Sequence, residues 1–344
     1  MADEEVATKA PESDAQEDAG KNPTTEDPVA RAGPTMGVRL NGFFVKSLQA
    51  NTSRNIARAI DLLQMERFLL ASELTKLGGV DVYIAKPADY PHSPSKLLLL
   101  LTGGTGLKSV NNQLQADKYA SEGFLVVMPD QFEGDPAPNA VSEPLPEHEP
   151  SFLDRVKHGI VDGTKSFMID MWLARHTPGK VLPLLHKVVS AAKEEFADAI
   201  ANGGGIYGVG YCFGAKYILL LAGEHPDSVL WGQENPGAEE EGMVKKGPYI
   251  KVGVVAHGTG VSPADIKNVK VPVSLICVQD DPMFPEEIWK AGEEALAKSG
   301  VEHEVKVYPD VPHGFAVLGD YEDAKIKEAQ QQAFGEMLGW LQAH

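Results

Sequence analysis

A short stretch of this chain places a cysteine between two glycines: Ile206-Tyr207-Gly208-Val209-Gly210-Tyr211-Cys212-Phe213-Gly214-Ala215-Lys216. A predicted strand over Ile206–Gly210 leads into the cysteine, and a predicted helix over Phe213–Ala222 leads away from it. Glycines two positions before and after the cysteine let the helix and a neighbouring strand approach closely. Free N–H groups and partial positive charge at a helix start favour a thiolate. The pattern therefore predicts Cys212 as a nucleophile, with a small buried hydrophobic residue as the alternative.

Strand-like and helix-like stretches alternate on both sides of this turn. Lys96–Leu101 and Phe124–Met128 are short apolar runs of the kind that a parallel sheet buries on both faces. The predicted helix Asn111–Glu122 lies between them, which makes a strand-helix-strand unit. Further strands are predicted at Val80–Ala85, Val252–Ala256, Val271–Val278 and Val301–Tyr308, and further helices at Val181–Ala201, Glu286–Ser299 and Ala324–His344. The sequence therefore predicts an α/β fold, a mostly parallel sheet with helices on both faces.

The first 75 residues differ in character from the rest. Residues 1–35 are acidic and have almost no large apolar side chains, so we expect a disordered tail. Residues 36–75 are expected to be an accessory extension, possibly helical, and the basic and apolar residues in it resemble a mitochondrial presequence. Because this segment lies behind an acidic tail, we expect a cytoplasmic protein, with mitochondria as the alternative. Residues 76–344 are expected to form the α/β domain.

Composition limits the classes of function. Acidic residues outnumber basic ones 49 to 31 and give a formal net charge of −18, which disfavours a nucleic-acid partner. The apolar runs are too short to span a bilayer, so we expect no membrane partner. The only cysteines are Cys212 and Cys277, which make no disulfide framework and are typical of a reducing compartment. We expect a monomer or a homodimer with a small-molecule substrate.

Residues that could activate the cysteine follow it along the chain. Asp280 and Asp281 come at the end of a predicted strand, before a proline turn. A carboxylate there can fix the tautomer of a histidine, and we expect Asp281 to do so, with Asp280 as the alternative. His313 lies in a proline-rich loop after another predicted strand. The order nucleophile, acid, histidine favours it over His257, which we expect in a structural or rim position.

The three motifs resemble those of the dienelactone hydrolase family, most closely its fungal branch. They are Cys212 with its neighbours, the Asp281-Pro282 turn and His313-Gly314-Phe315. The similarity extends from about Gly79 to the C-terminus and includes Gly106-Leu107, Ala116-Asp117-Lys118-Tyr119-Ala120, Glu122-Gly123-Phe124 and Pro129-Asp130. The resemblance implies an α/β-hydrolase fold, a catalytic triad of Cys212, Asp281 and His313, no metal or cofactor, and a lactone or ester substrate.

Two departures from the family pattern bear on the chemistry. The loop Thr102-Gly103-Gly104-Thr105-Gly106 lacks the acidic residue that family members often carry before the glycine. Its glycines suit an oxyanion hole formed by the N–H groups of Gly104 and Phe213, with a tight turn as the alternative. Ala316, Val317 and Leu318 follow the His-Gly-Phe motif, where family members often carry an arginine. We therefore expect a neutral or less acidic substrate.

Aromatic residues around these motifs are candidates for contact with the substrate. We expect this role for Tyr211, Phe315 and Trp172, the last in a stretch between residues 131 and 177 that could roof the site. The alternative for each is ordinary packing in the core.

The sequence thus predicts a cysteine hydrolase that works through a thioester. His313, oriented by Asp281, deprotonates Cys212, which attacks the acyl carbon, and water then cleaves the thioester. Two alternatives remain: a small-molecule-binding protein that has lost the chemistry, and a thioesterase or acyltransferase with the same triad. Faster alkylation of Cys212 than of Cys277 would disfavour the binding protein.

Overall fold

The computed structural model describes residues 72–138, 168–226, 245–319, 321 and 323–344. The predicted acidic tail and nearly all of the predicted extension lie outside the described residues. So do residues 139–167, which include most of the stretch expected to roof the site. Within the described ranges, no helix combines the length and the apolar character needed to cross a membrane.

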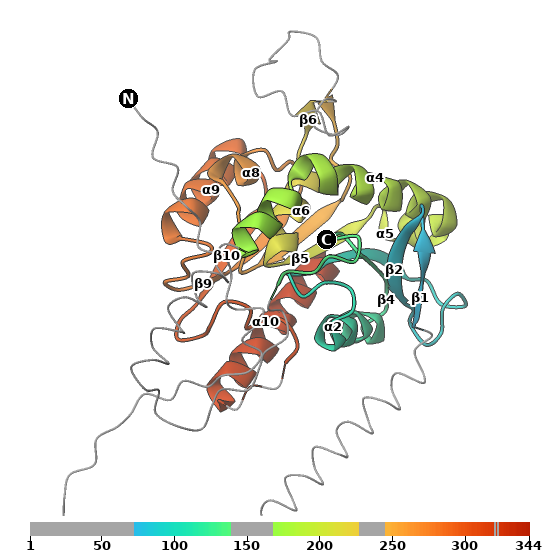
Figure 1. Ribbon diagram of the computed structural model, residues 1–344. Helices are drawn as coiled ribbons and strands as arrows, with labels where there is room; N and C mark the ends of the chain where they lie inside the picture. Colours follow the sequence, from blue (N-terminus) through green and yellow to red (C-terminus); the bar gives the residue numbers. More distant parts are fainter. Residues whose placement is uncertain (1–71, 139–167, 227–244, 320, 322) are drawn as a thin grey trace, which may run out of the picture.

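An eight-stranded sheet lies at the centre of the structure (Figure 1). In order across the sheet, the strands are β1 (Glu73–Leu77), β2 (Val80–Ala85), β4 (Phe124–Pro129), β3 (Lys96–Leu101), β5 (Tyr207–Tyr211), β8 (Val252–Ala256), β9 (Val273–Val278) and β10 (His303–Tyr308). The pairs β1–β2 and β2–β4 are antiparallel, and every pair from β4 to β10 is parallel. A separate two-stranded sheet joins β6 (His225–Pro226) to β7 (Lys245–Lys246). The expectation of a mostly parallel sheet is confirmed.

Helices cover both faces of this sheet (Figure 1). One face carries α4 (Pro178–Glu195), α5 (Ala197–Gly203), α6 (Phe213–Leu221), α8 (Pro263–Lys267) and α9 (Glu286–Ser299), and the other carries α2 (Val110–Ser121) and α10 (Ala324–Ala343). The residues of β3 alternate between the two apolar clusters: Leu97, Leu99 and Leu101 face the first group, Leu98 and Leu100 the second. Burial on both faces explains why β3 is apolar at successive positions.

The structure differs from the predicted elements in several places. The predicted helix Val181–Ala201 is two helices, α4 and α5, because the chain turns at Phe196 with φ −118° and ψ 36°. Strand β1 was not predicted, and it begins before residue 76. Four of its five residues are exposed, so it carries no apolar pattern. The short helix α8 was also not predicted.

Two glycines allow α6 to start directly behind the cysteine. A Cβ on Gly210 would lie 2.6 Å from the carbonyl oxygen of Gly214, and a Cβ on Gly214 would collide with the carbonyl of Leu101. The close approach is fixed by a 3.0 Å hydrogen bond from the N–H of Gly214 to the carbonyl of Thr102. The glycine spacing therefore sets how closely α6 packs on β3 and β5, as predicted for a sharp strand-to-helix turn.

Candidate active site

The loops after the parallel strands meet at one edge of the sheet, because the carboxyl ends of parallel strands lie at the same edge. Four non-glycine residues with positive φ lie within two residues of a strand end there: Cys212 (49°), His257 (38°), Asp280 (57°) and Asp310 (57°). Positive φ is unusual for side chains other than glycine, and such strain gathers at functional sites. This edge is therefore the candidate active site.

Cys212 lies between the end of β5 and the first residue of α6. Its N–H donates to the carbonyl of Ala256 at 3.0 Å, and its carbonyl accepts from the N–H of Thr259 at 3.0 Å. The side chain is buried, on the face of the sheet that α6 covers. Its sulfur lies 3.2 Å from the hydroxyl oxygen of Thr259. The thiol is thus held at the start of a helix with a polar group beside it.

His313 is paired with Asp281 and not with Asp280. Nδ1 of His313 lies 2.7 Å from Oδ2 of Asp281, and both side chains are buried. The second oxygen of Asp281 accepts from the N–H of Met283 at 2.9 Å, which fixes the carboxylate. Asp280 is exposed. An ionised Asp281 places the ring proton of His313 on Nδ1 and leaves Nε2 as an acceptor.

Thr259 joins these two parts of the site. Its hydroxyl oxygen lies 3.2 Å from Sγ of Cys212 and 3.3 Å from Nε2 of His313. Thr259 was not predicted from the sequence. Its position three residues after a predicted strand indicates this edge of the sheet, but its nearness to Cys212 depends on β5 and β8 being neighbours, which only the structure gives. Asp281, His313, Thr259 and Cys212 therefore form one continuous chain of polar contacts.

His257 lies against the imidazole of His313. The two rings are 4.9 Å apart between centroids, at an interplanar angle of 62°. His257 is fully buried, and neither of its ring nitrogens has a hydrogen-bond partner within the described part of the chain. Burial, together with electrostatic repulsion from His313, holds the pKa of His257 well below its usual 6.5. Because it is fully buried, His257 is not at a rim.

Lowering the pH is expected to destabilise the protein through His257. Below pH 6.5 the unfolded chain binds a proton at this residue, and the folded chain does not until its lower pKa is reached. The free energy of unfolding should therefore fall by up to about 1.4 kcal/mol per pH unit through that window. Urea unfolding across this range should show a weaker pH dependence in His257→Gln, which cannot titrate. An unchanged pH dependence in the variant would contradict this assignment.

The first turn of α6 presents the N–H of Phe213. The N–H of Gly214 donates to Thr102 and that of Ala215 to the carbonyl of Cys212. Among the described residues, no acceptor is found for the N–H of Phe213, which follows the cysteine directly. In the loop after β3, Gly104 accepts from the N–H of Ala137 at 2.8 Å through its carbonyl. The use of the Gly104 N–H toward an oxyanion stays a prediction.

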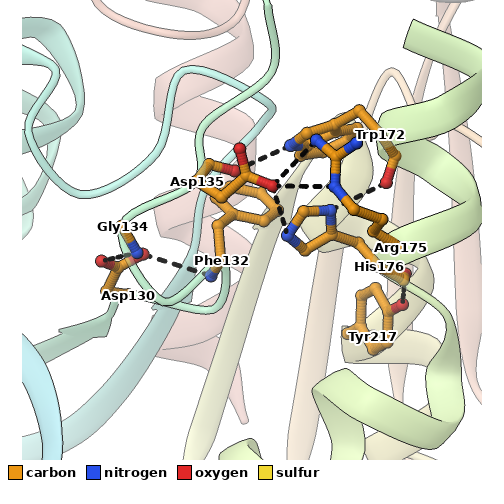
Figure 2. A network of polar contacts seen from close by, with 8 residues as sticks. All are labelled: Asp130, Phe132, Gly134, Asp135, Trp172, Arg175, His176 and Tyr217. Carbon is orange, nitrogen blue, oxygen red and sulfur yellow. Dashed lines mark hydrogen bonds and ion pairs between the residues drawn. The ribbon is translucent and has the colours of Figure 1, made fainter. Parts of the chain in front are cut away.

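The three aromatic residues expected at the substrate are buried in the core. Trp172, in the helical residues 168–175, donates from its ring N–H to the carbonyl of Asp135 at 2.7 Å (Figure 2). Its ring also packs 5.0 Å from that of Phe213. Tyr211 lies on the opposite face of the sheet from Cys212, with its hydroxyl 3.0 Å from that of Tyr119. Phe315 packs 4.9 Å from Tyr308. Contact of any of the three with a substrate stays a prediction.

A cavity of about 260 Å³ lies beside the network of Figure 2. Basic Arg175 and Lys180 and acidic Glu133 and Asp135 line it together, and the candidate triad does not. Asp135 accepts from Arg175 at 3.0 Å. Among the described residues, no group of three or more His, Cys, Asp or Glu side chains is placed to hold a metal ion.

Comparisons with known proteins place the chain in a family. Residues 80–231 and 242–344 match the model of the dienelactone hydrolase family. Hydrolase pyvD of Aspergillus violaceofuscus is 33% identical over 269 residues, which cover 78% of this chain and 89% of that protein. Hydrolase tropI of Talaromyces stipitatus is 26% identical and covers 78% of this chain and 88% of that protein. A solved structure, a putative dienelactone hydrolase from Klebsiella pneumoniae, is similar in fold, with a TM-score of 0.54, 17% identity, and coverage of 80% of this chain and 99% of that one.

Proposed function

Because the chain belongs to the dienelactone hydrolase family, with its α/β-hydrolase fold, and is an ester or lactone hydrolase, we propose that it uses Cys212, His313 and Asp281 as a catalytic triad. One observation carries the proposal. The Asp281 carboxylate holds Nδ1 of His313 at 2.7 Å, which leaves Nε2 as the base on the side of the thiol. The Thr259 hydroxyl joins Nε2 to the sulfur of Cys212 at the strand-to-helix turn, and a nucleophile connected to a general base is the arrangement that acyl transfer needs.

Acylation of the cysteine is the first half of the proposed reaction. His313 takes the proton of Cys212, and the Asp281 carboxylate stabilises the resulting imidazolium. The thiolate attacks the acyl carbon, and the N–H groups of Phe213 and Gly104 donate hydrogen bonds to the developing oxyanion. Such a donor is typically worth about 3 kcal/mol in the transition state. The alcohol leaves, or the lactone ring opens, as His313 donates its proton to the leaving oxygen.

Hydrolysis of the thioester is the second half. His313, neutral again, removes a proton from water, and the hydroxide attacks the acyl carbon of the thioester. Collapse of the second oxyanion returns the thiolate, which His313 reprotonates. His313 and Cys212 therefore take part in both half-reactions, so the loss of either residue affects both.

The proposed substrate is a small ester or lactone without an acidic group close to the reacting carbon. Ala316 and Val317 follow the histidine motif and are buried, so this loop offers no cation to a carboxylate. Cys212 and Cys277 are both free, which agrees with a reducing compartment, and we place the enzyme in the cytoplasm.

The proposal predicts a covalent acyl-enzyme on one cysteine. Incubating the enzyme with p-nitrophenyl acetate and quenching it in acid should trap an acetyl group on Cys212, which peptide mass spectrometry would locate. The Cys212→Ser variant, treated identically, controls for acetylation at other sites. A turnover-competent enzyme whose trapped acyl group is on another residue would contradict the proposal. Appearance of amide or ester products when an amine or alcohol is added would instead indicate an acyltransferase.

A further inference from the structure

The Thr259 hydroxyl contacts both groups that the proposed function assigns to proton transfer. It is 3.2 Å from the sulfur of Cys212 and 3.3 Å from Nε2 of His313, and its side chain is buried. A hydroxyl can accept one hydrogen bond while it donates another.

Hydrogen bonds hold the loop that carries Thr259 against the strand-to-helix turn at Cys212. The N–H of Thr259 donates to the carbonyl of Cys212 at 3.0 Å, so the two residues are joined through their backbones as well. The Lys216 ammonium, on α6, donates to the carbonyl of Gly260 at 2.8 Å. Further along the chain, Ser262 is the N-cap of α8, and its side chain accepts a hydrogen bond from the N–H of Asp265. The hydroxyl is therefore held in position by bonds on both sides of it.

The directions of the hydrogen bonds follow from the tautomer of His313. Its Nδ1 donates to Asp281, so in the neutral ring Nε2 can only accept. The hydroxyl of Thr259 must then donate to Nε2, and it accepts from the thiol of Cys212. The resting site is thus a chain in which each proton already points toward the next acceptor.

We propose that Thr259 relays the proton of Cys212 to His313, an inference that rests on the proposed hydrolase function. The S–H bond breaks as the sulfur's proton moves to the threonine oxygen. The proton that this oxygen carried moves to Nε2 of His313. The products are a thiolate, an unchanged threonine hydroxyl that now donates to the sulfur, and an imidazolium held by Asp281. No atom or electron is left over, and the reverse transfer restores the thiol after hydrolysis.

Two substitutions separate the relay from packing. Thr259→Val keeps the branched shape and removes the hydroxyl, and it should lower kcat/KM for an ester by about 10²-fold, the lower end of what general acid–base transfer contributes. Thr259→Ser keeps the hydroxyl and loses a methyl group, and it should retain most of the activity. Urea unfolding of both variants checks that the fold is intact. A Ser variant as impaired as the Val variant would overturn the relay, as would a Val variant with wild-type activity.

A measurement on the unmodified enzyme tests the same proposal. If two protons move in the step, kcat/KM measured in mixtures of H₂O and D₂O should curve with the deuterium fraction. The dependence should become linear in Thr259→Val, where only one proton can move directly. A linear dependence in the wild type would overturn the relay. That failure is distinct from failure of the hydrolase proposal, which is decided by whether Cys212→Ala retains turnover.

Discussion

Replacement of Cys212 by alanine is expected to lower kcat/KM for ester hydrolysis by at least about 10³-fold. The thiolate forms the bond to the acyl carbon, and an alanine side chain has no atom that can form it. What remains is the contribution of the oxyanion donors and of substrate binding, which the substitution does not touch. Because Cys212 and His313 act as one unit, a double variant with His313→Ala should be little worse than Cys212→Ala alone.

Cys277 provides the matched control for this loss. It is the other free cysteine, equally buried, and burial raises the pKa of its thiol far above the usual value. It lies within β9, paired with Val307 of β10. Cys277→Ala should keep kcat/KM near that of the wild type. Initial rates on p-nitrophenyl acetate and on a simple lactone would measure both variants. Full activity of Cys212→Ala on each active substrate would contradict a mechanism in which Cys212 is the nucleophile.

The fold was predictable because each of its signals is local. A buried strand such as β3 is recognised by its continuous apolar run. The strand-to-helix turn at Cys212 is recognised by the glycines at positions 210 and 214. These glycines are needed whatever the substrate is, because a Cβ at either position would collide with backbone. The elements that were missed lack such a signal. Strand β1 is mostly exposed, and the break at Phe196 lies within a stretch of uninterrupted helical periodicity.

The site was predictable only in so far as chain order reflects position on the sheet. His313 and Asp281 could be paired with Cys212 because each follows a parallel strand and the carboxyl ends of those strands share an edge. Which of Asp280 and Asp281 faces the histidine depends on the backbone conformation of the turn, which the tertiary structure sets. Thr259 was missed for the same reason, since its contact spans two loops. Tyr211 illustrates the opposite error: adjacency to Cys212 in sequence places it on the other face of the sheet.

The turn after β9 offers a comparison of two adjacent aspartates. Asp281→Asn is expected to lower kcat/KM by about 10³- to 10⁴-fold, because both carboxylate oxygens accept hydrogen bonds. One takes the Nδ1 proton of His313 at 2.7 Å and the other the N–H of Met283 at 2.9 Å. An asparagine has only one oxygen. If it faces Met283, the amide donates to Nδ1 and moves the ring proton to Nε2, so Nε2 can no longer act as the base. If the oxygen faces His313, the NH₂ group of the asparagine lies against the N–H of Met283, and neither donor has an acceptor there.

Asp280→Asn makes the identical chemical change one residue earlier and should leave kcat/KM nearly unchanged. Asp280 is exposed, and asparagine tolerates its φ of 57° as readily as aspartate does. The pair therefore separates loss of the His313 partner from any general effect of removing a negative charge at this turn. Steady-state rates on the same ester, with urea unfolding to verify both folds, would measure the difference. Equal losses in the two variants would show that charge, and not the tautomer of His313, is what Asp281 supplies.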